Sequence, residues 1–188
     1  MPSKNKAVFL DRDGVLNKAY GFRPPNNADE LILFPGVPEA IRGLNEAGYL
    51  VFVVTNQGGV GLGYMTEVEL DAIHARLEEL VGQAGGKFTE IAACIHKPKE
   101  GCACRKPKPG LILDLAERYN VDLEASFMVG DRDMDIQAGK AAGTRTILIK
   151  SKEKTTEEAD YTCPNLLAAS ELIVKLGLSG ALENGVEG

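Results

Sequence analysis

Two clusters of aspartates contain the residues best suited to chemistry. Asp11 and Asp13 lie in DRDGVLN, while Asp131, Asp133 and Asp135 lie in GDRDMD, and each cluster directly follows a short apolar run. Carboxylates that gather at one edge of a sheet repel one another and raise each other's pKa unless a cation neutralises them. Because hard oxygen ligands favour magnesium, the two clusters together predict a magnesium site.

The aspartates do not match a calcium-binding EF-hand loop. Counted from Asp11, the required glycine comes two residues early, at Gly14, and position twelve is Phe22. Counted from Asp131, positions six and twelve are Ile136 and Ala142. Solvated turns would explain either cluster alone, since aspartate is common in turns, but they explain poorly two clusters that each follow an apolar strand.

A polar, glycine-rich run, TNQGGVGLG, begins at Thr55 after another apolar stretch. A dinucleotide-binding fingerprint would need glycine at Tyr64, and a P-loop would need a Gly-Lys-Ser/Thr ending that this run lacks. The run is better explained as a flexible turn and a phosphate-accepting loop.

A loop of cysteine and histidine residues predicts a second metal site. Cys94, His96, Cys102 and Cys104 place three thiolates and one imidazole within eleven residues, a complete tetrahedral set for zinc. Four protein ligands leave no open position for water, so we expect a structural ion, with iron or no metal as the alternative. Disulfides are disfavoured, because Cys102 and Cys104 could not readily bridge each other and the expected compartment is reducing. Cys163 stands apart and is expected to be a small buried hydrophobic residue.

Short apolar runs alternate with longer segments of helical period, which is the pattern of βα repeats around a parallel sheet. Strands are expected at 7–10, 49–55, 91–95, 126–129 and 144–149, with a weaker one at 160–162. Helices are expected at 37–47, 66–82, 109–119, 134–142 and 166–176. The fold class is therefore α/β, a Rossmann-like doubly wound parallel sheet with helices on both faces and no large cap domain. In such sheets ligands collect at the carboxyl ends of the strands, where the reactive residues lie.

Local signals indicate where the helices begin and end. Thr66 and Glu69 have the spacing of a capping box. Three glycines are placed to end helices: Gly48, Gly143 and Gly177. We expect one domain over 1–188, with a frayed or disordered tail at about 177–188, where no apolar periodicity remains.

The composition limits the partners. The chain has 188 residues and a net charge of −6, so its overall field opposes nucleic acid. No stretch approaches the roughly 20 apolar residues of a membrane span, and the start has no signal-peptide pattern. We expect a soluble, cytoplasmic monomer that binds a small molecule and neither nucleic acid nor membrane. His74, on a polar helical face, is expected to be an exposed surface residue.

Four short motifs, in order along the chain, resemble those of the haloacid dehalogenase (HAD) superfamily. They are FLDRDGVLN at 9–17, VVTNQ at 53–57, the lysine of CRKPKPG at 106, and VGDRDMD at 129–135. The pair of aspartates one residue apart distinguishes the phosphatases of this superfamily from its dehalogenases. The resemblance spans nearly the whole chain and implies a magnesium-dependent phosphatase.

The resemblance also implies roles for individual residues. Asp11 would be the nucleophile that becomes an aspartyl-phosphate, and Asp13 the general acid and base. Magnesium would be held by Asp11, the backbone carbonyl of Asp13, and Asp131, with Asp135 in support. The substrate would be bound by Asp11, Arg12, Asp13, Ala19, Tyr20, Gly21, Phe22, Thr55, Asn56, Gln57, Gly58, Arg105, Lys106 and Arg132.

Within the superfamily the chain resembles the compact zinc-loop phosphatases, which act on heptose bisphosphates or on histidinol phosphate. The likeness is carried by LDRDGVLN, VVTNQGG, CRKPKPG, MVGDRDMDIQAG and the loop CIHKPKEGCAC. A departure is AYGFRPPNNADEL, at 19–31, which replaces the usual substrate loop. The sequence leaves the substrate open between a sugar bisphosphate and histidinol phosphate. A non-catalytic, zinc-stabilised binding protein is a further alternative, but it would not need both Asp11 and Asp13 together with Lys106 and Asp131.

Overall fold

The computed structural model describes residues 3–21, 23–151 and 154–183. Their centre is a six-stranded sheet with the strand order β3-β2-β1-β4-β5-β6, in which every neighbouring pair is parallel. The strands are β1 (Ala7–Leu10), β2 (Leu50–Asn56), β3 (Glu90–Cys94), β4 (Phe127–Gly130), β5 (Arg145–Ile149) and β6 (Tyr161–Cys163). The predicted doubly wound sheet is confirmed, and the described residues include no cap domain.

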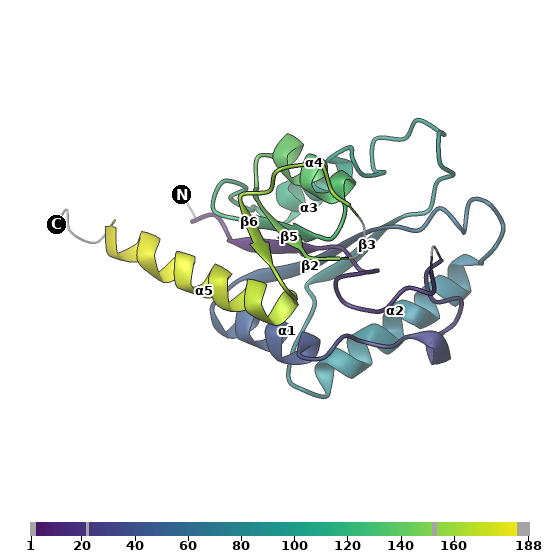
Figure 1. The fold of residues 1–188 in the computed structure, drawn as a ribbon, viewed down its shortest axis with the longest axis horizontal. Helices are drawn as coiled ribbons and strands as arrows, with labels where there is room; N and C mark the ends of the chain where they lie inside the picture. The colour runs from purple at the N-terminus through teal and green to yellow at the C-terminus, as the bar shows by residue number, and fades with distance from the viewer. Residues whose placement is uncertain (1–2, 22, 152–153, 184–188) are drawn as a thin grey trace.

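Helices cover both faces of the sheet (Figure 1). One layer holds α1 (Val37–Glu46), α2 (Glu67–Gly82) and α5 (Leu166–Glu183); the other holds α3 (Gly110–Arg118) and α4 (Asp133–Ala142). A short 3-10 helix, Ala28–Glu30, lies in the loop after β1 and has no counterpart among the predicted elements.

Side chains along β1 point alternately to the two faces of the sheet, and apolar residues on both faces have to be covered by helices. Val8 and Leu10 point into the core formed with α1, α2 and α5, while Ala7 and Phe9 point into the core formed with α3 and α4. All four residues have no exposed area. The ring of Phe9 stacks on Phe52 of β2 with centroids 5.3 Å apart. The central strands are thus buried on both sides, and this fixes where their carboxyl ends emerge.

The predicted strands agree with the observed ones to within a residue or so at each end. The capping box of α2 is also confirmed: the Glu69 backbone N–H donates to Thr66 Oγ1 at 3.2 Å, and the Thr66 N–H donates to Glu69 Oε2 at 2.8 Å. Gly143 follows α4 with a φ of 88°, as expected of a helix-ending glycine.

The expected end of the last helix at Gly177 is wrong. Helix α5 continues through this residue to Glu183, so the frayed tail predicted from 177 onward does not begin there, and 184–188 lie outside the described residues. A Cβ at Gly177 would lie 2.6 Å from the Tyr49 hydroxyl oxygen. Gly177 therefore serves close packing against Tyr49 and not helix termination.

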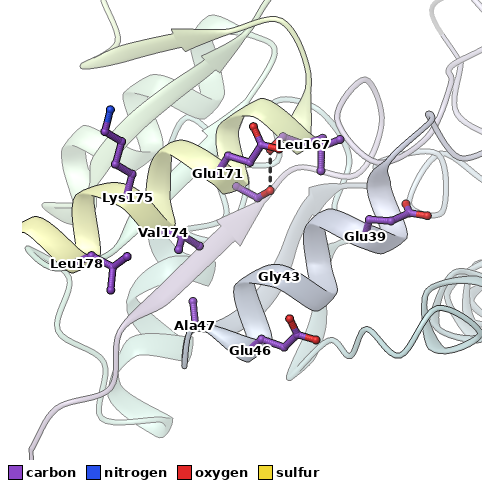
Figure 2. Close-up of a pocket in the computed structure, with 10 residues that line it drawn as sticks. Glu39, Gly43, Glu46, Ala47, Leu167, Glu171, Val174, Lys175 and Leu178 are labelled. Atoms are coloured by element: carbon purple, nitrogen blue, oxygen red, sulfur yellow. Dashed lines mark hydrogen bonds between the residues drawn. The ribbon is translucent and has the colours of Figure 1, made fainter.

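A groove of about 610 Å³ runs between α1 and α5 (Figure 2). Its lining combines apolar side chains with acidic ones: Glu39, Gly43, Glu46, Ala47, Leu167, Ser170, Glu171, Val174, Lys175 and Leu178. None of these residues belongs to the aspartate clusters or the cysteine loop, so the predicted chemistry lies elsewhere. Across the described ranges, no helix has both the length and the apolar character to span a bilayer.

Candidate active site

The sheet brings the two aspartate clusters together. Asp11 follows β1 and Asp131 follows β4, its neighbour in the sheet, while Asp135 lies in the first turn of α4. One oxygen from each of these three carboxylates lies within 4.8 Å of the other two. All three side chains are buried. Asp133 points away instead and accepts hydrogen bonds from Thr156, so it is not part of the cluster.

Lys106 places one positive charge among these carboxylates. Its Nζ lies 2.8 Å from Asp11 Oδ1 and 2.6 Å from Asp135 Oδ1, and the lysine is only 3% exposed. Burial alone would lower the pKa of Lys106, but Asp11 and Asp135 raise it above its ordinary value. Burial first, and then the charge of Asp135, raises the pKa of Asp11 to about 7 in spite of Lys106. One ammonium therefore does not compensate the three carboxylates.

The residues of this cluster fit a magnesium ion. They offer buried oxygen donors with excess negative charge, the donor set that magnesium prefers. The two oxygens of Asp135 accept hydrogen bonds from Lys106 Nζ and from the backbone N–H groups of Asp131 and Arg132. Asp135 thus supports its neighbours, which leaves Asp11 and Asp131 as the side chains best placed to hold the ion.

Asp13 is held apart from the cluster by three other side chains. Asn17 Nδ2 donates to Asp13 Oδ1 at 2.9 Å, and Gln57 Nε2 donates to Asp13 Oδ2 at 2.8 Å. The guanidinium of Arg12 contacts both oxygens, at 3.1 and 3.0 Å. Two carboxylates two residues apart therefore occupy different environments, which is how sites separate a nucleophile from a proton carrier.

Three side chains predicted to bind substrate make other contacts. Arg12 has no exposed area and pairs with Asp13. Gln57 bonds to Asp13 and to Thr55 Oγ1, while the amide of Asn56 donates to the carbonyl of Lys106 and accepts from its N–H, both at 3.0 Å. In this structure the three side chains are thus bonded to other protein groups, and their contact with substrate stays a prediction.

Other predicted residues surround the cluster. Thr55 is 1% exposed at the end of β2, and Lys106 lies beside Asp11. A Cβ at Gly58 would lie 3.0 Å from a terminal nitrogen of Arg105, so the glycine allows the arginine to approach. Arg105 and Arg132 are both half-buried.

The loop after β1 is closed on itself. The Tyr20 hydroxyl donates to the carbonyl of Glu30 at 2.7 Å, the Arg23 guanidinium lies over the Tyr20 ring, and Arg23 pairs with the Glu30 carboxylate at 2.6 Å. Ala19 is half-buried and Gly21 exposed. Phe22, also predicted to bind substrate, lies outside the described residues.

The prediction for His74 is wrong, and Asn17 was missed. His74 is not an exposed surface residue: it is half-buried, and its Nε2 lies 3.2 Å from a terminal nitrogen of Arg12. Burial, followed by the charge of Arg12, lowers the pKa of His74 to about 4. Asn17 is wholly buried against Asp13. Its position within the first motif was a possible signal, whereas no local pattern indicates His74.

The cysteine loop forms a compact cluster at the end of β3. Cys104 Sγ lies 3.3 Å from Cys94 Sγ and 3.2 Å from His96 Nδ1, and Cys102 Sγ lies 3.7 Å from Cys94 Sγ. The two sulfur–sulfur separations approach the edge of about 3.8 Å expected between sulfur ligands around zinc. All four cysteines are free, and Cys163 is buried away from the loop as predicted. Burial and the neighbouring thiols raise the pKa of Cys104 to about 12, a crowding that a bound cation would relieve.

The cysteine loop packs on the glycine-rich run. The Gly61 N–H donates to the carbonyl of Ile95 at 2.9 Å, and a side chain at Gly61 would overlap that carbonyl. The loop then leads from Cys104 directly into Arg105 and Lys106. The cluster could hold a metal ion, and it lies directly before these two cations in the chain.

Known proteins are similar to this chain in sequence and in fold. Residues 103–171 match the family model described as HAD-hydrolase-like. The chain is 42% identical to a D-glycero-beta-D-manno-heptose-1,7-bisphosphate 7-phosphatase of Pseudomonas putida, over 81% of this chain and 88% of that protein. It is 38% identical to the Bordetella bronchiseptica enzyme of the same name, over 90% and 98% of the two chains. The crystal structure of D,D-heptose 1,7-bisphosphate phosphatase from B. bronchiseptica, complexed with magnesium and phosphate, has a TM-score of 0.84 at 36% identity and covers 91% of this chain and 99% of that one.

A parallel sheet whose central strands are followed by Asp11 and Asp131, with Lys106 paired to Asp11 and Asp135, defines a hydrolase of the haloacid dehalogenase superfamily. The resemblance expected from the four motifs is confirmed. Within that superfamily, the chain belongs to the family of D-glycero-beta-D-manno-heptose-1,7-bisphosphate 7-phosphatases.

Proposed function

We propose that this chain is a magnesium-dependent phosphatase that removes the C7 phosphate of a D-glycero-D-manno-heptose 1,7-bisphosphate through an aspartyl-phosphate on Asp11. The observation that carries the proposal is the separation of the two carboxylates. Asp11 lies buried beside Lys106, while Asp13 is tied to Arg12, Asn17 and Gln57 outside the acidic cluster. The similar proteins of Pseudomonas putida and Bordetella bronchiseptica are named for that activity.

Asp11 attacks phosphorus in line with the departing sugar oxygen and forms the aspartyl-phosphate, which divides one difficult step into two easier ones. The side chains of Asp11 and Asp131 and the backbone carbonyl of Asp13 would hold magnesium, which would supply positive charge between the nucleophile and the phosphate. Lys106 supplies a further cation beside Asp11. Thr55 and nearby backbone N–H groups bind phosphoryl oxygens.

Asp13 moves protons in both halves of the reaction. Its carboxylic acid form protonates the departing sugar oxygen, and the carboxylate left behind then takes a proton from the water that attacks the aspartyl-phosphate. The donors Asn17 and Gln57 hold this carboxylate on opposite oxygens. Arg105 and Arg132, next to Lys106 and Asp131 in the chain, are the side chains we assign to the second phosphate of the substrate.

We assign zinc to Cys94, His96, Cys102 and Cys104 as a structural ion. With four protein ligands it has no open position for water, so it orders the loop and does not take part in the reaction. The thiolates need a reducing compartment to remain available, which favours the cytoplasm. We treat 1–188 as a single phosphatase domain that works as a monomer.

A substrate panel with controlled metals tests the proposal. The protein is stripped with a chelator, reloaded with magnesium, and assayed on both anomers of the heptose 1,7-bisphosphate, on histidinol phosphate and on simple sugar phosphates. We expect activity only with magnesium and the highest kcat/KM on a heptose bisphosphate. A preference for histidinol phosphate would establish the sibling activity instead, and magnesium-independent turnover would contradict the mechanism.

A further inference from the structure

A fully buried arginine lies behind the proposed general acid. The side chain of Arg12 is the largest of those with almost no exposed area. Its Nε lies 3.3 Å from Asp13 Oδ1, and one terminal nitrogen lies 3.0 Å from Asp13 Oδ2. A guanidinium that contacts both oxygens fixes the plane of the carboxylate as well as its position.

The other terminal nitrogen of Arg12 meets His74, a residue 62 positions away on α2. Because the ring of His74 is neutral at pH 7, its Nε2 can accept the hydrogen bond from Arg12 across the 3.2 Å between them, with the ring proton on Nδ1. His74 follows Ile73, which is wholly buried in the core under the sheet, and Leu70 and Leu77 anchor the same helix.

We infer that His74 is a positioning residue for proton transfer by Asp13, acting through the buried guanidinium of Arg12. This inference rests on the proposed function. Asn17 and Gln57 also donate to Asp13, but both lie on segments next to the site, at the end of the first motif and after β2. His74 alone among the contacts described here ties this group to α2.

The physical reason is the cost of leaving a buried donor without an acceptor. If His74 lost its ring, a buried N–H of Arg12 would lose its acceptor, and the guanidinium would turn to find another partner. Asp13 would follow, because the two side chains share one set of hydrogen bonds. Misplacing a reacting group by about 1 Å can cost on the order of a hundredfold in rate.

Two substrates with different leaving groups distinguish a role in proton transfer from a merely structural one. Nitrophenolate leaves without being protonated, whereas the oxygen of a sugar must receive a proton as it departs. A misplaced Asp13 should therefore slow formation of the aspartyl-phosphate from a sugar phosphate but not from p-nitrophenyl phosphate. With the aryl ester, the first turnover releases nitrophenolate as a burst, and only the later hydrolysis of the intermediate needs Asp13 as a base.

The experiment compares wild type, His74→Ala, His74→Gln and Arg12→Lys on both substrates in the magnesium-loaded full chain. For His74→Ala we expect kcat on the heptose bisphosphate to fall about tenfold with KM unchanged, while the rate of the nitrophenolate burst stays within about twofold. His74→Gln, whose amide oxygen can accept from Arg12, should recover most of the loss. Arg12→Lys keeps the positive charge but loses the planar guanidinium that contacts Asp13 and His74 together. It should therefore show the same kinetic changes as His74→Ala. Arg76→Ala, an exposed change on the same helix, is the matched control.

Three results would overturn the inference: unchanged kcat in His74→Ala, equal losses in the burst and in sugar phosphate turnover, or no recovery in a folded His74→Gln. If His74→Ala does not fold, the glutamine and lysine variants still decide the question by the same comparison. An inactive wild type would instead count against the proposed function, so the two failures are distinguishable.

Discussion

Glycine at position 14 shows how closely the residues of the site are packed. Gly14 has a φ of 92°, in the left-handed region, and a Cβ at this position would overlap the carboxylate of Asp131. A side chain there is thus excluded twice, by the backbone and by the acid proposed to hold magnesium. The absence of a side chain at Gly14 therefore leaves the space that the carboxylate of Asp131 occupies.

Gly14→Ala should weaken magnesium binding, because Asp131 must move to accommodate the new methyl group. Gly48→Ala is the matched control: its φ is 83°, but no atom lies within 4 Å of its would-be Cβ. We expect both variants to lose about 1–2 kcal/mol of stability from the left-handed backbone. Only Gly14→Ala should need roughly tenfold or more magnesium for half-maximal activity, measured by metal titration. Equal magnesium requirements in the two variants would contradict this role of Asp131.

A site residue could be predicted from the sequence where its own neighbours in the chain indicate its role. Asp11 and Asp131 lie directly after strands, and Asp13 is two residues beyond Asp11, so residue type and topology indicate the same positions. His74 reaches the site through the packing of α2, and its neighbours in sequence give no hint of Arg12. The polar side chains of Asn56 and Gln57 suggested substrate contacts, and only the folded structure shows that they bond to Lys106 and Asp13.

At the scale of elements, the cysteine loop leads directly into the segment that carries Arg105 and Lys106. The loop has few apolar side chains whose burial could stabilise one conformation. Binding of a metal ion would therefore supply the free energy that orders it. Asn56 then fixes the backbone of Lys106 with two hydrogen bonds from the end of β2. Two elements therefore converge on the position of one lysine.

Cys104→Ser should lose zinc and lower kcat/KM on the order of tenfold to a hundredfold, because the cations that follow the loop are no longer held in place. Cys163→Ser is the control: Cys163 is buried in the core and takes no part in the cluster, so zinc should be retained. Elemental analysis and steady-state kinetics are measured on each variant. A zinc-free Cys104→Ser with unchanged kinetics would show that the loop does not position the cations.

Helix α5 shows why element ends are hard to predict from sequence. Gly177 has the residue type of a helix stop, and only the approach of Tyr49 in the folded chain explains its presence inside a helix. The other helix-ending glycines were predictable because their conformations are local. The extra turns of α5 lengthen the groove that it forms with α1, which includes Leu178 (Figure 2).

Gly177→Ala should destabilise the protein, although alanine is the better helix former by about 1 kcal/mol. The new methyl group would meet the buried Tyr49 hydroxyl, and overpacking typically costs about 1–3 kcal/mol. Combining it with Tyr49→Phe removes the oxygen, so alanine should then be neutral or stabilising. Urea unfolding of the single and double variants measures the difference. Stabilisation by Gly177→Ala alone would mean that α5 does not pack on Tyr49 as described.

At the scale of the whole molecule, the parallel sheet converts distant sequence into one site. Strand β1 lies between β2 and β4, so their carboxyl ends bring Asp11, Thr55 and Asp131 to one edge of the sheet. The two helical layers bury the central strands, and the third strand brings the cysteine loop to the same edge. The fold class was predictable because short apolar runs alternate with segments of helical period along most of the sequence.

The central claim, that the reaction passes through a phosphorylated Asp11, is tested most directly by trapping that intermediate. Asp13→Asn should slow hydrolysis of the intermediate while leaving the nucleophile intact, so the phosphorylated protein should accumulate with p-nitrophenyl phosphate and magnesium. After acid quench, mass spectrometry of peptides should find one phosphoryl group on Asp11, and none in a double variant that also carries Asp11→Asn. A phosphoryl group on another residue, or turnover by Asp11→Asn at the wild-type rate, would contradict the account.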